Sequence, residues 1–225
     1  MSSRALAGAI AAMVARFDVA DGLNHLLEAC SEAYPAEAVA VLVSRPSGGL
    51  ELLSSTSHRA AEIELLQIQS SSGPCVEALQ QNERISASGD EMVERWGEIG
   101  STILAAGYGA VHAYPMHWRG QAIGGLNIFV KRAATPDLEL GQMFADLATL
   151  MVLQPSDISA DQLVARIHEA VNSRAVIEQA KGVLAHQLGS DMSGAFNELL
   201  DTARRTGATL TATAADIVKK AYRRS

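Results

Sequence analysis

Residues 177–184 read Ile-Glu-Gln-Ala-Lys-Gly-Val-Leu, and this stretch decides how the end of the chain folds. Ile177 and Ala180 are three residues apart, which places them on one apolar face of a helix. Ala180 and Gly182 are small, so they leave room for the close approach of another helix or of a phosphate backbone. Lys181 stands between them and points away from at least one of these contacts. The stretch therefore predicts a helix that packs on one side and offers a close contact on another.

Helical patterns continue on both sides of this stretch, without a β-branched run or a hairpin pattern. The expected helices are Ser159–Ala185, Ser193–Thr206 and Thr211–Tyr222. Gly189 and Gly207 follow the first two helices, where a left-handed cap favours glycine. Ser190, and either Thr209 or Thr211, are the expected N-caps of the helices that follow. The end of the chain is thus predicted to be an all-α unit of three helices.

The apolar residues of these helices predict a very small core. Its expected members are Ile177, Ala180, Val183, Leu184, Phe196, Leu199, Leu210, Ile217 and Val218. Phe196 is the expected anchor, because one buried aromatic side chain removes much apolar surface from water.

The same segment carries a spaced pattern that is typical of a known family. Downstream of residues 177–184 come Ala195-Phe196-x-x-Leu199, Ala203-Arg204, Leu210 and Ala214-x-x-Ile217-Val218. Over about Val171–Lys220 the chain resembles the ANTAR domain, the RNA-binding output module of bacterial antiterminators. The resemblance implies a homodimer that binds paired RNA hairpins in nascent transcripts. Such binding prevents formation of an intrinsic terminator, and so acts on the RNA polymerase elongation complex indirectly.

Charge is distributed unevenly along the chain, whose formal net charge is −7. Residues 1–159 carry 9 Lys and Arg against 18 Asp and Glu, whereas residues 160–225 carry 9 against 7. The bases gather at the end of the chain, at Arg204, Arg205, Lys219, Lys220, Arg223 and Arg224. The negative net charge argues against nucleic-acid binding by the charge of the whole chain. The cluster of bases instead favours the C-terminal helices as a nucleic-acid-binding surface.

The candidate RNA-binding residues combine the helical stretch with four of these bases. They are Ala180, Lys181, Gly182, Arg204, Arg205, Lys219 and Lys220. Lys and Arg supply phosphate contacts, and Arg also stacks on unpaired loop bases. The plainer alternatives are a solvated Lys181 and arginines that only complement the dipole of their helix. At Leu200 the ANTAR pattern typically has arginine, so one candidate RNA contact is missing from this chain.

The preceding part of the chain alternates between strand and helix patterns. The expected strands are Ala38–Ser44, Leu50–Ser55, Arg84–Ala87, Gly109–Trp118 and Gln121–Val130, with hairpin turns at Pro46–Gly49 and Arg119-Gly120. The expected helices are Ser3–Val14, Leu23–Tyr34, Arg59–Gln69, a short helix from Cys75, Glu98–Ala106 and Asp137–Leu153. This order predicts an α/β (α+β) fold, a mainly antiparallel sheet flanked by helices. A break at Gln154–Asp157 divides the chain into domains 1–154 and 155–225.

The first domain resembles a GAF domain, a small-molecule-sensing fold. The residues that carry the resemblance are Leu26-Leu27-x-x-Cys30, Gly73-Pro74-Cys75-x-x-Ala78, Tyr114-Pro115 and Gly124-Gly125-Leu126-Asn127-Ile128-Phe129. The resemblance covers roughly Phe17–Leu153. It implies a pocket between the sheet and its covering helices that binds a small-molecule ligand, which the sequence leaves unidentified.

Cys75 and His112 are the candidate ligand-sensing or redox-sensing residues of this domain. A thiol at a helix N-terminus has a lowered pKa, which would suit redox sensing by Cys75, but a buried inert thiol is the preferred interpretation. The positions of His58, His112, His117 and Cys75 in the sequence do not match the short spacings of known metal-binding motifs, so no metal site is predicted.

The chain is expected to work in the cytoplasm without membrane contact. Two cysteines, Cys30 and Cys75, are too few for a disulfide framework, and no apolar run reaches the ~18 residues of a membrane span. The apolar run Leu6–Ala15 resembles a signal peptide, but Arg16 and Asp18 follow without a cleavage region, so an amphipathic helix is the preferred interpretation.

The predicted function is a signal-responsive antitermination regulator and not an enzyme. Helices Ser3–Val14 and Asp137–Leu153 are expected to pair between two subunits, so that a ligand changes the spacing of two RNA-binding units. Two alternatives stay open. One is a DNA-binding transcription factor with a GAF sensor, although the turns do not match a helix-turn-helix joint. The other is a GAF-type redox enzyme, since the pair Cys30 and Cys75 resembles that of the GAF-type methionine sulfoxide reductases, although a clustered set of cysteines is missing.

Overall fold

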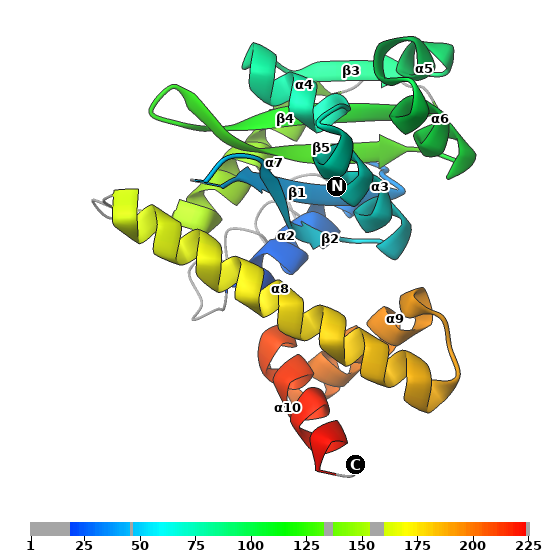
Figure 1. The fold of residues 1–225 in the computed structure, drawn as a ribbon, viewed down its shortest axis with the longest axis vertical. Helices are drawn as coiled ribbons and strands as arrows, with labels where there is room; N and C mark the ends of the chain where they lie inside the picture. Colours follow the sequence, from blue (N-terminus) through cyan, green and yellow to red (C-terminus); the bar gives the residue numbers. More distant parts are fainter. Residues whose placement is uncertain (1–18, 46, 133–136, 154–159, 224–225) are drawn as a thin grey trace.

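The computed structural model describes residues 19–45, 47–132, 137–153 and 160–223, apart from the side chains of residues 160–170. A sheet domain comes first, and three C-terminal helices lie beside one edge of it (Figure 1). The expected helix Ser3–Val14 and the expected break at Gln154–Asp157 lie outside the described residues. The boundary between domains at 154 and 155 therefore stays a prediction.

The sheet has five antiparallel strands in the order β2-β1-β5-β4-β3. The strands are β1 (Ala38–Ser44), β2 (Leu50–Ser55), β3 (Ile85–Ser88), β4 (Ala110–Trp118) and β5 (Gln121–Val130). Between β4 and β5 the chain reverses at Arg119 and Gly120, whose φ angles are 50° and 81°. A two-residue hairpin turn of this kind needs positive φ at both positions. The predicted strands and hairpins are confirmed, with bounds that differ by one residue at most.

Helices cover both faces of the sheet. One face carries α2 (Val19–Ala33) and α7 (Leu138–Leu153); the other carries α3 (His58–Ser70), α4 (Pro74–Gln81), α5 (Asp90–Trp96) and α6 (Glu98–Ala105). β1 is buried on both sides because it lies inside the sheet between these layers, and this explains its continuous apolar sequence. Within the described ranges, no helix is both long and apolar enough to cross a membrane.

The C-terminal helices are α8 (Ala160–Leu188), α9 (Met192–Thr206) and α10 (Leu210–Tyr222). Gly189 and Gly207 have φ angles of 60° and 66°, as the left-handed caps require. Thr209 is the N-cap of α10, and its hydroxyl accepts a hydrogen bond from the Ala212 amide. The prediction of Ser190 as the other N-cap is wrong. Asp191 occupies that position, because its carboxylate reaches the Gly194 amide at 2.7 Å.

Candidate nucleic-acid interface

Helices α8, α9 and α10 pack around a small core in which alanines alternate with larger apolar side chains. Its buried members from these helices are Ile177, Ala180, Leu184, Ala195, Leu199, Ala203, Leu210 and Ala214. Alanines let helix backbones approach closely, so the core is compact but buries little area. Ala20 of α2 belongs to the same cluster, and it joins this core to the sheet domain.

Phe196 is not the buried anchor that the sequence predicts. It is half-buried at the rim of the core, and the Nζ atom of Lys181 lies 5.3 Å from the centroid of its ring. An ammonium group above an aromatic face is attracted by the quadrupole of the ring. The ring therefore has to lie where the amine can reach it, and Leu199 takes the central place in the core instead.

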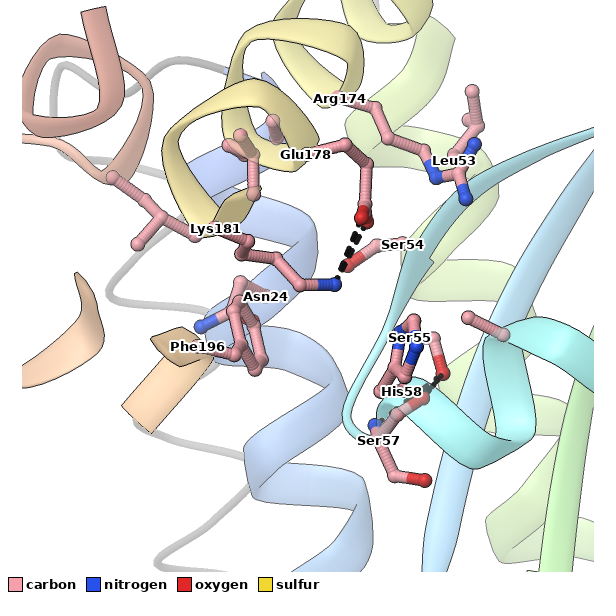
Figure 2. Close-up of a pocket in the computed structure, with 14 residues that line it drawn as sticks. Asn24, Leu53, Ser54, Ser55, Ser57, His58, Arg174, Glu178, Lys181 and Phe196 are labelled. Carbon is pink, nitrogen blue, oxygen red and sulfur yellow. Dashed lines mark hydrogen bonds and ion pairs between the residues drawn. The ribbon is translucent and has the colours of Figure 1, made fainter. Parts of the chain in front are cut away.

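Lys181 points toward the sheet domain (Figure 2). Its Nζ donates to both carboxylate oxygens of Glu178, at 2.9 and 3.0 Å, and its side chain is 4% exposed. Lys181 and Glu178 line a cavity of about 30 Å³, and β2 supplies Ser54 and Ser55 to the same cavity. In this arrangement the Lys181 amine does not reach a phosphate outside the protein.

Ala180 and Gly182 have different surroundings on α8. Ala180 is fully buried in the core, so it contacts neighbouring helices and not an outside partner. Gly182 is exposed, on a solvent-facing line with Gln179 and His186. A Cβ atom added at Gly182 would meet no atom within 4 Å. Packing inside the chain does not require glycine here, and the bare backbone is open to an outside partner.

The other candidate bases lie on the surface of α9 and α10. All four are exposed: Arg204, Arg205, Lys219 and Lys220. Arg205 lies 3.6 Å from Glu198, and Lys220 pairs with Asp216. Exposed pairs of this kind contribute only about 0–1 kcal/mol, so a phosphate can replace the carboxylate.

Arg204 and Leu200 face α2 of the sheet domain. The Nη2 atom of Arg204 donates to the Glu28 carboxylate of α2 at 3.0 Å. Leu200 is half-buried, and with Glu28 it lines a hollow of about 230 Å³ between α9 and α2. The position at which the family pattern has arginine thus carries an apolar side chain beside the sheet domain.

Cys75 is fully buried beside Ala40 and Leu42 of the sheet. Cys75 lies near the N-terminus of α4. Burial nevertheless raises the pKa of its thiol well above the ordinary value, and the nearby Glu64 carboxylate raises it further. The cost of desolvating a thiolate here exceeds the benefit of the helix N-terminus. The neutral thiol that results is not the nucleophilic form that redox sensing uses.

His112 lies on the opposite face of the sheet from Cys75. Its Nδ1 atom lies 3.0 Å from the Ser86 hydroxyl, and burial lowers its pKa. With Tyr34, whose ring centroid is 6.0 Å away, His112 lines a hollow of about 490 Å³ near Lys131. In the part of the chain that the structure describes, no three His, Cys, Asp or Glu side chains form a group that could hold a metal ion.

A buried polar network that the sequence does not predict lies between the sheet and α3. The fully buried carboxylate of Glu64 accepts hydrogen bonds from the Asn127 amide at 2.7 Å and from the Gln67 amide at 2.5 Å. Gln67 in turn accepts a hydrogen bond from the backbone N–H of Cys75. Burial raises the pKa of Glu64 to about 8. These side chains occupy part of the space in which the sequence predicts a ligand pocket.

The C-terminal helices match a known family. The family model of the ANTAR domain matches residues 165–218, which include most of α8, all of α9 and most of α10. These residues form an ANTAR domain. The match ends before Lys219 and Lys220, so these two candidate bases lie just beyond it.

The sheet domain has the fold of solved GAF domains. The GAF domain of an Acinetobacter phosphoenolpyruvate-protein phosphotransferase aligns with a TM-score of 0.52 and 14% identity, covering 70% of this chain and 97% of that one. The GAF domain of the corresponding Coxiella burnetii protein has a TM-score of 0.51 and 16% identity, with coverages of 77% and 96%. At these identities the likeness shows the fold alone. No curated protein sequence matches the chain.

Gly182→Ala is expected to stabilise the ANTAR domain and to weaken its binding to hairpin RNA. Glycine inside a helix costs about 1 kcal/mol relative to alanine, and the new methyl group meets no atom of the chain. The melting temperature of this small domain, followed by circular dichroism, should rise by about 4–8 °C. RNA affinity should fall several-fold, because the methyl group keeps the RNA backbone away from α8.

The control for this substitution is Gln179→Ala, on the same exposed line of α8. Its RNA affinity should fall less than that of Gly182→Ala, because the RNA backbone can still approach the bare glycine. A lower melting temperature for Gly182→Ala would contradict the open surroundings of this position.

Proposed function

We propose that the chain is an antitermination regulator in the cytoplasm, whose ANTAR domain binds hairpins in nascent RNA under control of the GAF domain. The ANTAR match over residues 165–218 carries the proposal, because ANTAR domains are the RNA-binding part of antitermination regulators. The regulator acts on the elongating RNA polymerase indirectly, since it changes which hairpin the transcript forms. The proposal includes no catalytic step.

The exposed bases of α9 and α10 support RNA binding. Arg205 and Lys219 project from the ends of their helices, where phosphates can reach them. Among the described residues no acid pairs with Lys219, so its charge is available to an outside anion. This local group of bases explains how an acidic chain can bind an acidic polymer.

The deciding experiment compares hairpin RNA with duplex DNA of equal length, by fluorescence anisotropy over a series of salt concentrations. We expect preference for the RNA. Arg205→Ala and Lys219→Ala should each weaken binding and reduce the slope of log affinity against log salt by about 1. Arg45→Ala, which removes an exposed arginine of the sheet domain, should leave the slope unchanged. Preference for duplex DNA would favour the DNA-binding alternative, and no binding to either would reject both.

We propose that two copies of the chain act together, one for each hairpin of a pair. On α7, Met143, Leu147 and Leu150 follow each other at spacings of four and three; Met143 and Leu147 are partly buried and Leu150 is exposed. Such a stripe suits pairing with the same helix of a second copy. Light scattering with and without hairpin RNA tests this, and a monomer in both conditions would contradict it.

We propose that the signal is a small molecule bound by the GAF domain. The hollow of about 490 Å³ beside His112 and Tyr34 combines apolar walls with a few polar groups, which is typical of small-molecule sites. A redox signal at Cys75, or methionine sulfoxide reduction there, has less support because the thiol is buried and its pKa is raised.

A further inference from the structure

Helix α2 of the GAF domain contacts the ANTAR domain at two points on one side. The carboxylate of Asp21 accepts a hydrogen bond from the backbone N–H of Leu210, the first residue of α10, at 2.8 Å. Seven residues later, the carboxylate of Glu28 accepts a hydrogen bond from Arg204 at 3.0 Å. Seven residues are about two helical turns, so both carboxylates lie on the same face of α2.

Both contacts pair a negative group with a positive one. The N–H of Leu210 belongs to the first turn of α10, where unpaired amides and the helix dipole favour an anion. The guanidinium of Arg204 is a permanent cation, and it is one of the residues proposed to bind RNA phosphate. Helix α2 therefore offers carboxylates where a bound RNA would offer phosphates.

Strand β2 covers a third positive group of the ANTAR domain. The Lys181 amine lies in the cavity between α8 and β2, held by Glu178 and the ring of Phe196 (Figure 2). Ser54 and Ser55 form the wall that faces it from β2. Its low exposure thus depends on the GAF domain as well as on its neighbours in the ANTAR domain.

Apolar contacts support the same arrangement. Ala20 of α2 lies in the core cluster of the ANTAR domain, and Leu200 of α9 lines the hollow against α2. An arginine at Leu200 would place a further cation in this contact, whereas leucine packs there without a charge to desolvate. The contact between domains therefore combines burial with complementary charge.

We infer that the GAF domain and hairpin RNA compete for one face of the ANTAR domain, which carries Lys181 and Arg204. The inference rests on the proposed function, which supplies RNA as the competitor. The structure is the closed form, in which α2 and β2 occupy this face. Gly182, Arg205 and Lys219 stay exposed in the closed form, so RNA binding is weakened and not abolished. Only the open form offers Lys181 and Arg204 together with these residues, so the apparent affinity for RNA rises with the fraction of open molecules.

The test is the double variant Asp21→Ala/Glu28→Gln in the full chain. It should bind hairpin RNA about tenfold more tightly than the unchanged chain, because two weak surface contacts together change the open fraction by about this factor. Glu28→Gln alone, a conservative change, should give an intermediate gain and serves if the double variant does not fold. The matched control is Glu32→Gln, which removes an exposed charge of the same helix and should leave the affinity unchanged.

The closed form can be detected in an experiment that uses no RNA, by measuring how fast an amine-acetylating reagent modifies individual lysines. In the unchanged chain Lys181 should react far more slowly than the exposed Lys219. In the double variant the rate at Lys181 should rise about tenfold, in step with the open fraction, while the rate at Lys219 stays constant.

These measurements separate the inference from the proposed function. If the double variant binds RNA with the affinity of the unchanged chain, the competition is overturned. If Lys181 and Lys219 react equally fast in the unchanged chain, the closed form is overturned. If no variant binds RNA, the proposed function and the competition built on it both fail, and the labelling rates still decide whether the closed form exists.

Discussion

Leu199→Ala is expected to unfold the ANTAR domain while the GAF domain keeps its structure. Leu199 is fully buried, and it is one of four large side chains among the eight buried core residues of α8, α9 and α10, the other four being alanines. Truncating a buried leucine to alanine costs about 2–5 kcal/mol, because burial is lost and a cavity remains. A three-helix unit with so small a core has little more stability than that. Hairpin RNA binding should be lost with the fold.

Hydrogen exchange followed by mass spectrometry measures this outcome separately for each domain. Peptides from α8, α9 and α10 should lose protection, and peptides from β1 and β5 should keep it. Leu188→Ala is the control, since Leu188 is 55% exposed and its truncation should change stability by less than about 0.5 kcal/mol. Loss of protection in the GAF peptides as well would show that the two domains unfold together, contrary to this expectation.

The ANTAR helices could be predicted from the sequence because the features that end and begin them are local. Gly189 and Gly207 mark two helix ends by their left-handed conformation, and Thr209 caps the helix that follows. The sequence predicts Ser190 instead of Asp191 as the N-cap of α9 for a reason that is also local. Both residue types cap helices well, and only the position of the helix start decides which side chain reaches the free amide.

Two features escaped prediction because they depend on contacts between distant parts of the chain. Lys181 and Glu178 are three residues apart, so their pairing is a local possibility, but the wall of β2 over them is set by the tertiary fold. The bond between Asp21 and Leu210 joins residues 189 positions apart. Helix α5 was missed for a different reason: its seven residues between two glycines bury only Met92 and Trp96, too few for a helical pattern.

Glu64 also escaped prediction, because a glutamate in a helix is usually exposed and only the packing of α3 on the sheet buries this one. We expect the stability of the GAF domain to fall between pH 5 and pH 8 because of it. Burial raises the pKa of Glu64 from its ordinary value of 4.5 to about 8. In this range the folded domain holds a proton that the unfolded chain releases, so raising the pH favours unfolding. The stabilisation is complete below about pH 4.5 and is lost by about pH 8, a change on the order of 5 kcal/mol.

Glu64→Gln tests this assignment because it removes the titrating group and keeps the shape of the side chain. The new amide can accept the hydrogen bond from Asn127, but its NH₂ group faces the NH₂ group of Gln67, so one hydrogen bond is lost. The variant should therefore be less stable than the unchanged protein at pH 5, and the two urea-unfolding free energies should converge or cross by pH 8. Glu62→Gln, an exposed change on the same helix, should keep the pH dependence of the unchanged protein. Parallel curves for Glu64→Gln and the unchanged protein would mean that Glu64 is already ionised at pH 5, contrary to the effect of its burial.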